Sequence, residues 1–464
     1  MHTWRLPGFR LPHCVTLFAL LVGPTFVGCD RQQIPPLSVQ QAAQSRSTGQ
    51  AVAPGEAAQP IRKGNVIFIH PDGTGYNTWA ALRILEKGPD GMLNWDRMDK
   101  IGLYRAHQLD AIGTTSNAGA TSHAFGVKCE MDDYGIDPDR PFTSLSGKDA
   151  SIMFEAMRAG YAVGVINSGH INEPGTGVFL ANVKSRDMDD AISAQIIHSG
   201  ADLIFSGGEK LLLPDGVTGH FGSPGERADG RNLIEEAKQL GYTVIYTRAE
   251  LSTLAEDAKK VLGVFAANHT FNDLPEEQLR DRVLPMYSPE APTLAEMTEA
   301  ALKFFERKGK PFFLVVEEEG TDNFGNVNNA AGVLTALGRA DEAIGVAMDF
   351  IEREPDTLLV LAADSDAAGM QVHAAALKKP LRSNDVNGAP LDGRDGTGSL
   401  PFVAEADRQG QRMGFAVSWA AFDDVYGGVV AKAHGLNAQL LPNNVDNTDI
   451  YRLMYATLFG KWLD

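Results

Sequence analysis

Short runs of consecutive apolar residues recur along the chain, and longer segments with helical spacing separate them. Uninterrupted apolarity indicates strands that are covered on both faces, because a half-exposed strand would alternate apolar and polar residues. The pattern predicts an α/β fold with a doubly wound, mainly parallel central sheet flanked by helices. The expected strands lie at residues 66–69, 162–166, 203–205, 312–316 and 358–362, and the clearest helices at 233–240, 294–308 and 340–354.

The first 29 residues have the pattern of an export signal. A mostly apolar stretch, residues 15–27, is too short to span a bilayer comfortably and contains a proline. Its end, Phe26-Val27-Gly28-Cys29, resembles a bacterial lipobox, which predicts a lipidated Cys29. The alternative is an ordinary signal peptide that is cleaved near the same place. We therefore expect an exported protein that is periplasmic or anchored to the membrane by lipid.

Three further segments follow the signal. Residues 30–62 are rich in Gln, Ala, Ser and Pro without periodicity, which predicts a flexible linker. Residues 63–464 carry the strand and helix pattern of one catalytic domain. Within it, residues 378–398 are rich in Gly, Asp, Asn and Pro, so we expect an inserted surface loop region at about residues 370–412.

Composition and charge narrow the classes of function. The 464 residues are 44% hydrophobic, which is enough for a substantial core. The formal net charge of −18 argues against a nucleic-acid partner, since binding a phosphate backbone normally takes a basic stripe. Cys129 is the one cysteine beyond the signal and linker segments, so no intrachain disulfide is expected in the folded part.

Acidic residues follow three of the expected strands: Asp72, Glu317 and Asp364. The carboxyl ends of parallel strands meet at one edge of the sheet, where functional groups collect. One buried carboxylate there could be a structural cap, but three would repel each other unless cations neutralise them. The pattern favours a divalent metal cluster.

Several segments match, in order, the motifs of one enzyme family. They span roughly residues 63–460, and a shared order is more specific than any single motif. On these residues the chain resembles the alkaline phosphatase family. The segments are 69–75, 114–128, 183–186, 207–208, 229–234, 316–322, 363–364 and 446–450.

The resemblance implies a nucleophile and a phosphate-binding residue. Ser116 would attack phosphorus and form a phosphoserine intermediate, although a serine in such a turn is more often a helix N-cap. A helix expected at residues 117–128 would place its N-terminus beside the developing negative charge. Arg186 would grip the phosphate oxygens with its planar fork of donors, the alternative being a solvated arginine at a helix end.

The resemblance also implies metal ligands for two metal ions and a third site, as two-metal phosphoryl transfer requires. Asp72 would bridge the nucleophile-side metal and the third site, with Asp364 and Ser116 completing the former. Glu317, with Glu173 beside it, would serve the third site. Asp322 would bind the leaving-group-side metal.

The family's metal-binding histidines are absent from the matching positions. Asn326 stands four residues after Asp322, Ser365 stands directly after Asp364, and Asp423 or Asp424 stands near the last position, where we favour Asp424. Oxygen ligands suit hard cations, so we expect Mg²⁺ or Ca²⁺ in modest preference to Zn²⁺.

The remaining histidines have no paired metal-ligand spacing. We interpret them as structural or surface-exposed: His70, His123, His170, His220 and His434. His123 is a possible exception, because it follows Ser116 by seven residues and could lie on the same helix face near the rim of the site.

The resulting functional hypothesis is metal-dependent hydrolysis of small phosphate monoesters, which releases inorganic phosphate outside the cytoplasm. Two alternatives stay open: a phosphodiesterase of the same superfamily, and a phosphate- or metal-binding pseudoenzyme that lacks turnover. Family members are often homodimers, so the resemblance also raises a homodimer as an expectation.

Overall fold

The computed structural model describes residues 60–137, 140–381 and 390–464. The predicted export signal, Cys29 and nearly all of the linker lie outside these residues. In the described part of the chain, no helix is both long and apolar enough to cross a bilayer.

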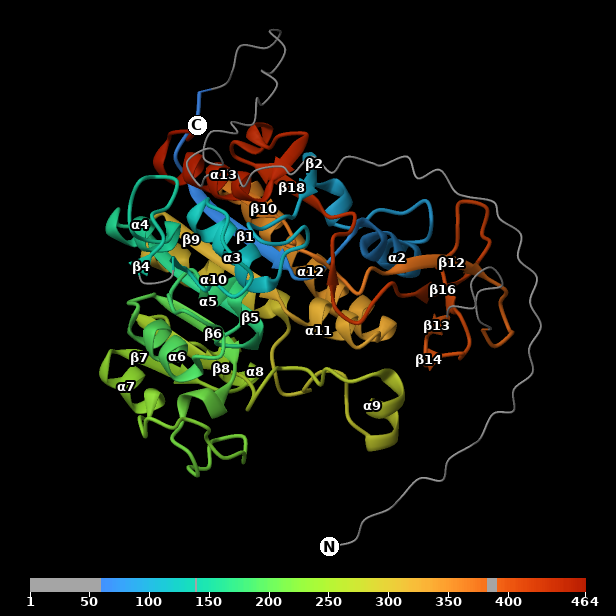
Figure 1. Cartoon of the computed structure of the whole chain (residues 1–464), viewed down its shortest axis with the longest axis horizontal. Helices are drawn as coiled ribbons and strands as arrows, with labels where there is room; N and C mark the ends of the chain where they lie inside the picture. Colours follow the sequence, from blue (N-terminus) through green and yellow to red (C-terminus); the bar gives the residue numbers. More distant parts are fainter. Residues whose placement is uncertain (1–59, 138–139, 382–389) are drawn as a thin grey trace, which may run out of the picture. The chain divides into compact units, whose positions relative to one another are not determined.

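Ten strands form one large sheet (Figure 1). Every neighbouring pair is parallel except the two that involve residues 430–435. The prediction of a mainly parallel sheet is confirmed. In spatial order the strands are β19 (Asn444–Asp446), β2 (Lys100–Arg105), β18 (Val430–Gly435), β10 (Thr357–Leu361), β1 (Asn65–Pro71), β9 (Phe312–Glu318), β5 (Ala162–His170), β6 (Leu203–Gly207), β8 (Lys260–Val264) and β7 (Tyr242–Ile245).

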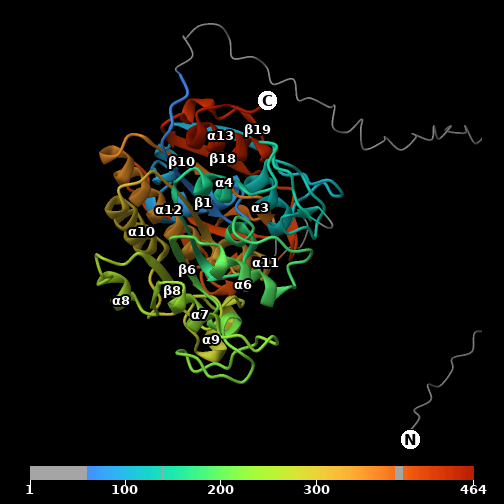
Figure 2. The same cartoon turned by 90° about the vertical axis from the view of Figure 1, so that its left-hand side faces the viewer.

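Helices cover both faces of this sheet, which Figure 2 shows edge-on between them. One face is covered by α3 (Ser116–Phe125), α4 (Ile152–Arg158), α6 (Asp189–His198), α7 (Leu233–Gln239) and α13 (Asn447–Phe459). The other is covered by α2 (Tyr76–Lys87), α10 (Leu294–Lys308) and α12 (Ala330–Arg353). The shorter helices are α5 (Pro174–Gly177), α8 (Arg248–Ser252), α9 (Glu276–Arg282) and α11 (Gly320–Asn326).

Strand β1 shows why the central strands read as continuous apolar runs. Val66 and Phe68 belong to the core under one helical layer, whereas Ile67 and Ile69 belong to the core under the other. Successive side chains point to opposite faces of a strand, and both faces are buried here. All four residues must therefore be apolar.

Two helices differ from the expected bounds. Helix α12 begins at Ala330, ten residues before the expected start, because the side chain of Asn329 accepts a hydrogen bond from the Gly332 N–H at 2.6 Å and caps the helix. Helix α3 ends at Phe125 rather than residue 128, since Gly126 takes a left-handed conformation with φ 70°.

The inserted region at residues 370–412 differs from the expected loop. Together with residues 414–418 it forms a small antiparallel sheet beside α2 (Figure 1). The strands were not predicted because they are only two to five residues long and the Gly- and Asp-rich turns between them dominate the composition. They are β12 (Gln371–Ala375), β13 (Asp392–Gly393), β14 (Gly396–Thr397), β15 (Phe402–Val403) and β16 (Gly414–Ser418).

Candidate active site

Strand β1 ends in a buried histidine and a buried aspartate. The Nε2 atom of His70 lies 3.3 Å from Oδ1 of Asp72 and 3.8 Å from Oε1 of Glu317. The Nδ1 atom of His70 is 2.7 Å from the carbonyl oxygen of Ala362, which fixes the orientation of the ring. The Gly73 N–H donates to Asp72 at 2.8 Å. Parallel pairing of β1 with β9 brings these side chains together at one edge of the sheet.

Glu317 is held by residues of β5 and α5. Its Oε2 accepts a hydrogen bond from Asn167, whose amide also donates to the Thr176 hydroxyl at 2.8 Å. A Cβ added at Gly175 would lie only 1.8 Å from Oε1 of Glu317. Gly175 therefore leaves room for this carboxylate.

Ser116 is the first residue of α3, and the N-cap is Thr115. The capping role that competed with the nucleophile interpretation is thus excluded. The first turn of α3 packs on Asp364, because a Cβ added at Gly119 would lie 2.3 Å from the Asp364 Cβ. The Ser116 hydroxyl makes no hydrogen bond within the described part of the chain, and the residue is 7% exposed.

Asp322, Asn326 and Asp424 form a second group of ligands. The Asn326 side chain donates to the two oxygens of Asp322 at 3.1 and 3.0 Å and to Oδ1 of Asp424 at 3.2 Å. Asp322 and Asn326 share one face of α11, since they are four residues apart. Asp424 is positioned by β17 (Asp424–Val425), which pairs with β11 (Asp366–Ala367). The structure thus brings Asp424, rather than the exposed Asp423, to the position favoured from the sequence.

Many polar atoms at this edge of the sheet are buried without a hydrogen-bond partner in the described part of the chain. Isolated buried charges are costly unless they are paired or bound to cations. The donor set therefore fits divalent metal ions. The atoms are Asp72 Oδ2, Glu317 Oε1, both oxygens of Asp364, Ser365 Oγ, Asp366 Oδ1 and Asn326 Oδ1.

The pKa values of Asp364 and Asp322 are raised, whereas that of Asp72 is lowered, because the effect of His70 outweighs that of burial. Burial, and then the charge of Asp72, raise the pKa of Asp364 well above its usual range. Burial, and then the charge of Asp424, do the same for the pKa of Asp322. Burial opposes charge on His70 as well, yet Asp72 and Glu317 raise its pKa to about 9. A bound cation would reverse these shifts, because it favours the charged carboxylates.

Glu173 and Arg186 lie beside this cluster. Arg186 follows α5, and its Nη2 is 3.5 Å from Oε2 of Glu173, while the arginine side chain is half exposed. The other oxygen of Glu173 faces His170 and His269 at 2.9 and 3.1 Å. Glu173 is therefore directed toward two histidines rather than into one ligand set with Asp72 and Glu317.

His70 is buried, which is compatible with its structural interpretation, whereas the interpretation of His123 as a residue near the rim needs correction. His70 is fully buried between two carboxylates, and the signal that could have found it is its two-residue spacing to Asp72, which follows β1. His123 does not reach a solvent-facing rim; it is buried, and its Nε2 lies 2.7 Å from the hydroxyl of Tyr104. His170 contacts Glu173, together with His269, which the sequence analysis did not single out.

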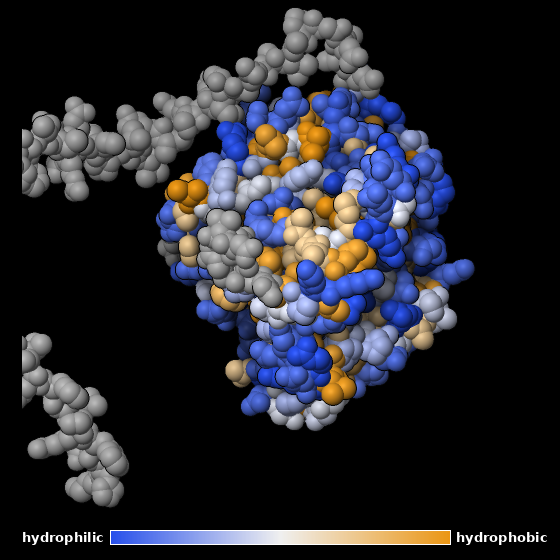
Figure 3. All heavy atoms as spheres, turned by 90° about the vertical axis from the view of Figure 1, so that its right-hand side faces the viewer, coloured by the Kyte–Doolittle hydropathy of each residue, from blue (hydrophilic) through white to orange (hydrophobic). Residues whose placement is uncertain are grey.

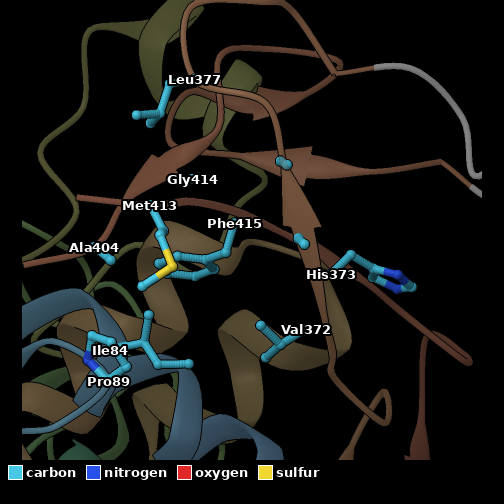
Figure 4. Close-up of a pocket in the computed structure, with 11 residues that line it drawn as sticks. Ile84, Pro89, Val372, His373, Leu377, Ala404, Met413, Gly414 and Phe415 are labelled. Carbon is cyan, nitrogen blue, oxygen red and sulfur yellow. The ribbon is translucent and has the colours of Figure 1, made fainter. Parts of the chain in front are cut away.

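A separate apolar cavity of about 530 Å³ lies between α2 and the small sheet (Figure 4). Ile84, Val372, Met413 and Phe415 line it, and none of the predicted site residues does. Apolar surface positions gather on this face of the molecule (Figure 3). The cavity therefore belongs to the inserted sheet and not to the carboxylate cluster.

Solved structures show the same fold. The alkaline phosphatase of the Antarctic bacterium TAB5 superposes with a TM-score of 0.65 at 20% identity, covering 86% of this chain and all of that one. The alkaline phosphatase of Thermus thermophilus gives 0.66 at 21% identity over 87% of this chain and 93% of that one. Another TAB5 structure, a His-to-Asp mutant, is described as having Mg bound in its M3 site.

Curated relatives agree with the structural likeness. The chain is 25% identical to the alkaline phosphatase of Escherichia coli over 85% of this chain and 86% of that protein. It is 28% identical to the repressible alkaline phosphatase of Saccharomyces cerevisiae over 67% of this chain, a match that spans 56% of the yeast protein. The alkaline phosphatase family profile matches residues 63–390. The chain therefore belongs to the alkaline phosphatase family.

Proposed function

We propose that this protein hydrolyses small phosphate monoesters at the carboxylate cluster, with Ser116 as nucleophile. The observation that carries the proposal is the packing of Asp364 against the first turn of α3, which Ser116 begins, since Asp364 is buried and interacts with Asp72, Asp322 and Asp424. Family membership supports the same chemistry. The arrangement suits a reaction in which negative charge develops next to bound cations and helix-terminal N–H groups.

The reaction then runs in two displacements. The Ser116 hydroxyl loses its proton and its oxygen forms a bond to phosphorus as the ester P–O bond breaks, and the departing alkoxide takes up a proton. Water next cleaves the phosphoserine and releases inorganic phosphate. Arg186, whose side chain is half exposed beside Glu173, binds two oxygens of the phosphate group and orients it.

Metal ions would be held by Asp72, Glu317 and Asp364 in one group and by Asp322, Asn326 and Asp424 in the other. When bound, divalent cations lower the pKa of the Ser116 hydroxyl and stabilise the leaving oxygen. We expect Mg²⁺ or Ca²⁺ to serve better than Zn²⁺, since most of these ligand atoms are oxygens. His70 adds one nitrogen donor, which reduces the expected preference for Mg²⁺ or Ca²⁺ over Zn²⁺.

The test is hydrolysis of p-nitrophenyl phosphate by metal-stripped protein that is refilled separately with Mg²⁺, Ca²⁺, Mn²⁺ and Zn²⁺. We expect Ser116→Ala to lower kcat at least ~10³-fold. Ser122→Ala is the matched control, because its hydroxyl bonds to the Ala118 carbonyl in the same helix. Activity that survives Ser116→Ala, or no activity with any of the four metals, would overturn the proposal and leave a diesterase or a pseudoenzyme.

We also propose that the protein is exported and anchored by a lipid on Cys29. The support is the apolar segment at residues 15–27 and the lipobox-like sequence that ends in this cysteine. The mature N-terminus is determined by mass spectrometry of protein from membrane and periplasmic fractions. We expect a diacylated Cys29 at the mature N-terminus of the wild type. Cys29→Ser should lack the lipid and be released from the membrane. An unmodified N-terminus in the wild type would refute lipid anchoring.

A further inference from the structure

His170 and His269 both contact one oxygen of the buried Glu173, outside the main carboxylate cluster. His170, the last residue of β5, and Glu173 lie where β5 leads into α5, and His269 follows β8, so two segments far apart in the chain meet here. Both histidines point their Nε2 atoms at Oε1 of Glu173, at 2.9 and 3.1 Å. The two imidazole rings lie side by side with their centroids 4.8 Å apart.

A second buried carboxyl group lies beside Glu173. The Glu173 side chain is only 4% exposed, and the His269 side chain is 8% exposed. Glu319 is buried close by, since a Cβ added at Gly169 would lie 2.8 Å from the Glu319 Cγ and 2.9 Å from the Glu173 Cγ. Oε2 of Glu319 has no hydrogen-bond partner in the described part of the chain. A carboxylate in this position calls for a cation.

His269 is also supported from behind. Its Nδ1 lies 3.7 Å from a carboxylate oxygen of Asp273 and 3.4 Å from the amide nitrogen of Asn323. In protein metal sites, a ligating histidine commonly has its other ring nitrogen oriented by a carboxylate. A proton on Nδ1, facing the Asp273 carboxylate, leaves the lone pair of Nε2 directed at Glu173 and able to bind a cation.

We propose that His170, Glu173 and His269 bind a transition metal ion of the Zn²⁺ type, at a site distinct from the oxygen-rich cluster. Two imidazole nitrogens and one carboxylate oxygen are donors that Zn²⁺ accepts readily, whereas Mg²⁺ and Ca²⁺ prefer oxygen ligands. The ligand atoms of the three residues all lie within 4.8 Å of one another. Glu319 lies beside these three residues without belonging to their ligand set.

Occupancy of this site would change the partner of Arg186. Glu173 now offers Oε2 to Arg186 at 3.5 Å. A cation on Oε1 withdraws negative charge from the carboxylate and weakens its hold on the guanidinium, which leaves Arg186 freer to bind phosphate oxygens. This consequence rests on the proposed role of Arg186, but the metal site itself does not.

The experiment measures tightly bound zinc by elemental analysis in wild type and in the double variant His170→Gln, His269→Gln, after loading with Zn²⁺ and exhaustive dialysis. We expect the double variant to lose one equivalent of Zn²⁺ per chain. Loading with Co²⁺ gives a second readout, since the visible absorption contributed by the histidine-ligated ion should disappear with the same two side chains. The thermal unfolding midpoint of each protein establishes that it is folded.

His198→Gln is the matched control, because His198 is 44% exposed and contacts Glu236 and Arg231 instead of Glu173. The control should keep the full zinc content. Equal zinc content and equal Co²⁺ absorption in wild type and the double variant would overturn the proposal and identify the group as an ion-pair network. Metal content is measured without substrate, so a failure of the phosphatase proposal at Ser116 leaves this result unaffected.

The link to Arg186 has its own measurement. Calorimetric titration with inorganic phosphate, with and without Zn²⁺ on a Mg²⁺ background, should show at least ~5-fold tighter binding with Zn²⁺ in wild type and no such change in the double variant. The same zinc effect in both proteins would overturn the link.

Discussion

His70 Nε2 lies 3.3 Å from Asp72 Oδ1, with both side chains fully buried at the end of β1. The contact joins a nitrogen donor to the carboxylate that would bridge two metal positions. His70 also lies 3.8 Å from Glu317, so it touches two of the three carboxylates that follow the central strands.

Replacing His70 should therefore weaken metal binding. His70→Gln removes an imidazole that either binds a cation or positions Asp72, and losses at such positions are about 10- to 100-fold in affinity or activity. The measurement is the metal concentration that gives half-maximal hydrolysis. His434→Gln is the control, since His434 contacts Asp99 rather than the cluster. An unchanged metal requirement in His70→Gln would show that the ring is only a packing element.

Asn326→His should shift the metal preference toward zinc. The variant puts an imidazole next to Asp322 and Asp424, where Asn326 now donates its amide hydrogens. We expect the ratio of Zn²⁺-supported to Mg²⁺-supported activity to rise at least ~10-fold, about 1.4 kcal/mol in differential stabilisation. Asn328→His, two residues along, is the control. A ratio that does not move would argue that Asn326 binds no metal.

Chelation should destabilise the folded protein. The buried carboxylates of Asp72, Asp364 and Asp322 repel one another, and bound cations relieve this repulsion. At free metal 100-fold above Kd, the folded state gains ~2.7 kcal/mol. Calorimetry with EDTA and with excess Mg²⁺ gives the shift in unfolding temperature. The shift should shrink in Asp364→Asn, and a temperature independent of metal would rule out a tightly held cluster.

Gly175→Ala should be poorly tolerated. An added Cβ would lie 1.8 Å from Glu317 Oε1, so either α5 or the carboxylate must move. Overpacking of this kind costs about 1–3 kcal/mol. Urea denaturation checks the loss of stability, and metal titration checks whether Glu317 has shifted. Gly113→Ala is the control, because its nearest neighbour would be 3.9 Å away, and equal stability of the two variants would contradict the close packing.

Glu276 should make stability depend on pH. Its carboxylate accepts a hydrogen bond from the Ala331 N–H at the start of α12. The neighbouring Ala330 N–H donates to Asp392, so the two carboxyl groups lie close together. Burial, and then the charge of Asp392, raise the pKa of Glu276 to about 8. The folded state thus binds more protons than the unfolded state between the ordinary pKa and this value. Its free energy of unfolding should fall as pH rises, by at most ~1.4 kcal/mol per pH unit.

Glu276→Gln removes this proton uptake while keeping an oxygen for the Ala331 N–H. Urea denaturation from pH 5 to pH 9 should give a smaller fall in stability for the variant than for wild type. Glu342→Gln, on the exposed face of α12, serves as the control. If Glu276→Gln and wild type lose stability in parallel, Glu276 does not carry the excess proton.

The pattern of apolar residues predicted the central strands well, because each of these strands is buried on both faces and contains few polar residues. It did not foretell the small sheet at β12 to β16, whose strands are short and whose turns dominate the composition. The start of α12 at Ala330 could not be predicted, because Ala330, Ala331 and Gly332 show little hydrophobic periodicity. The helix begins there because Asn329 caps it.

The sequence by itself determined the family, the α/β fold, and the identity of the acidic and serine residues that gather at one edge of the sheet, because strand ends and motif order are local properties of the chain. Only the tertiary structure decided how those residues combine. His70 joined Asp72 and Glu317, while Glu173 turned toward His170 and His269, a contact between residues 96 positions apart in the case of His269. Such pairings depend on which strands become neighbours and on side-chain directions, and neither is written in local spacing.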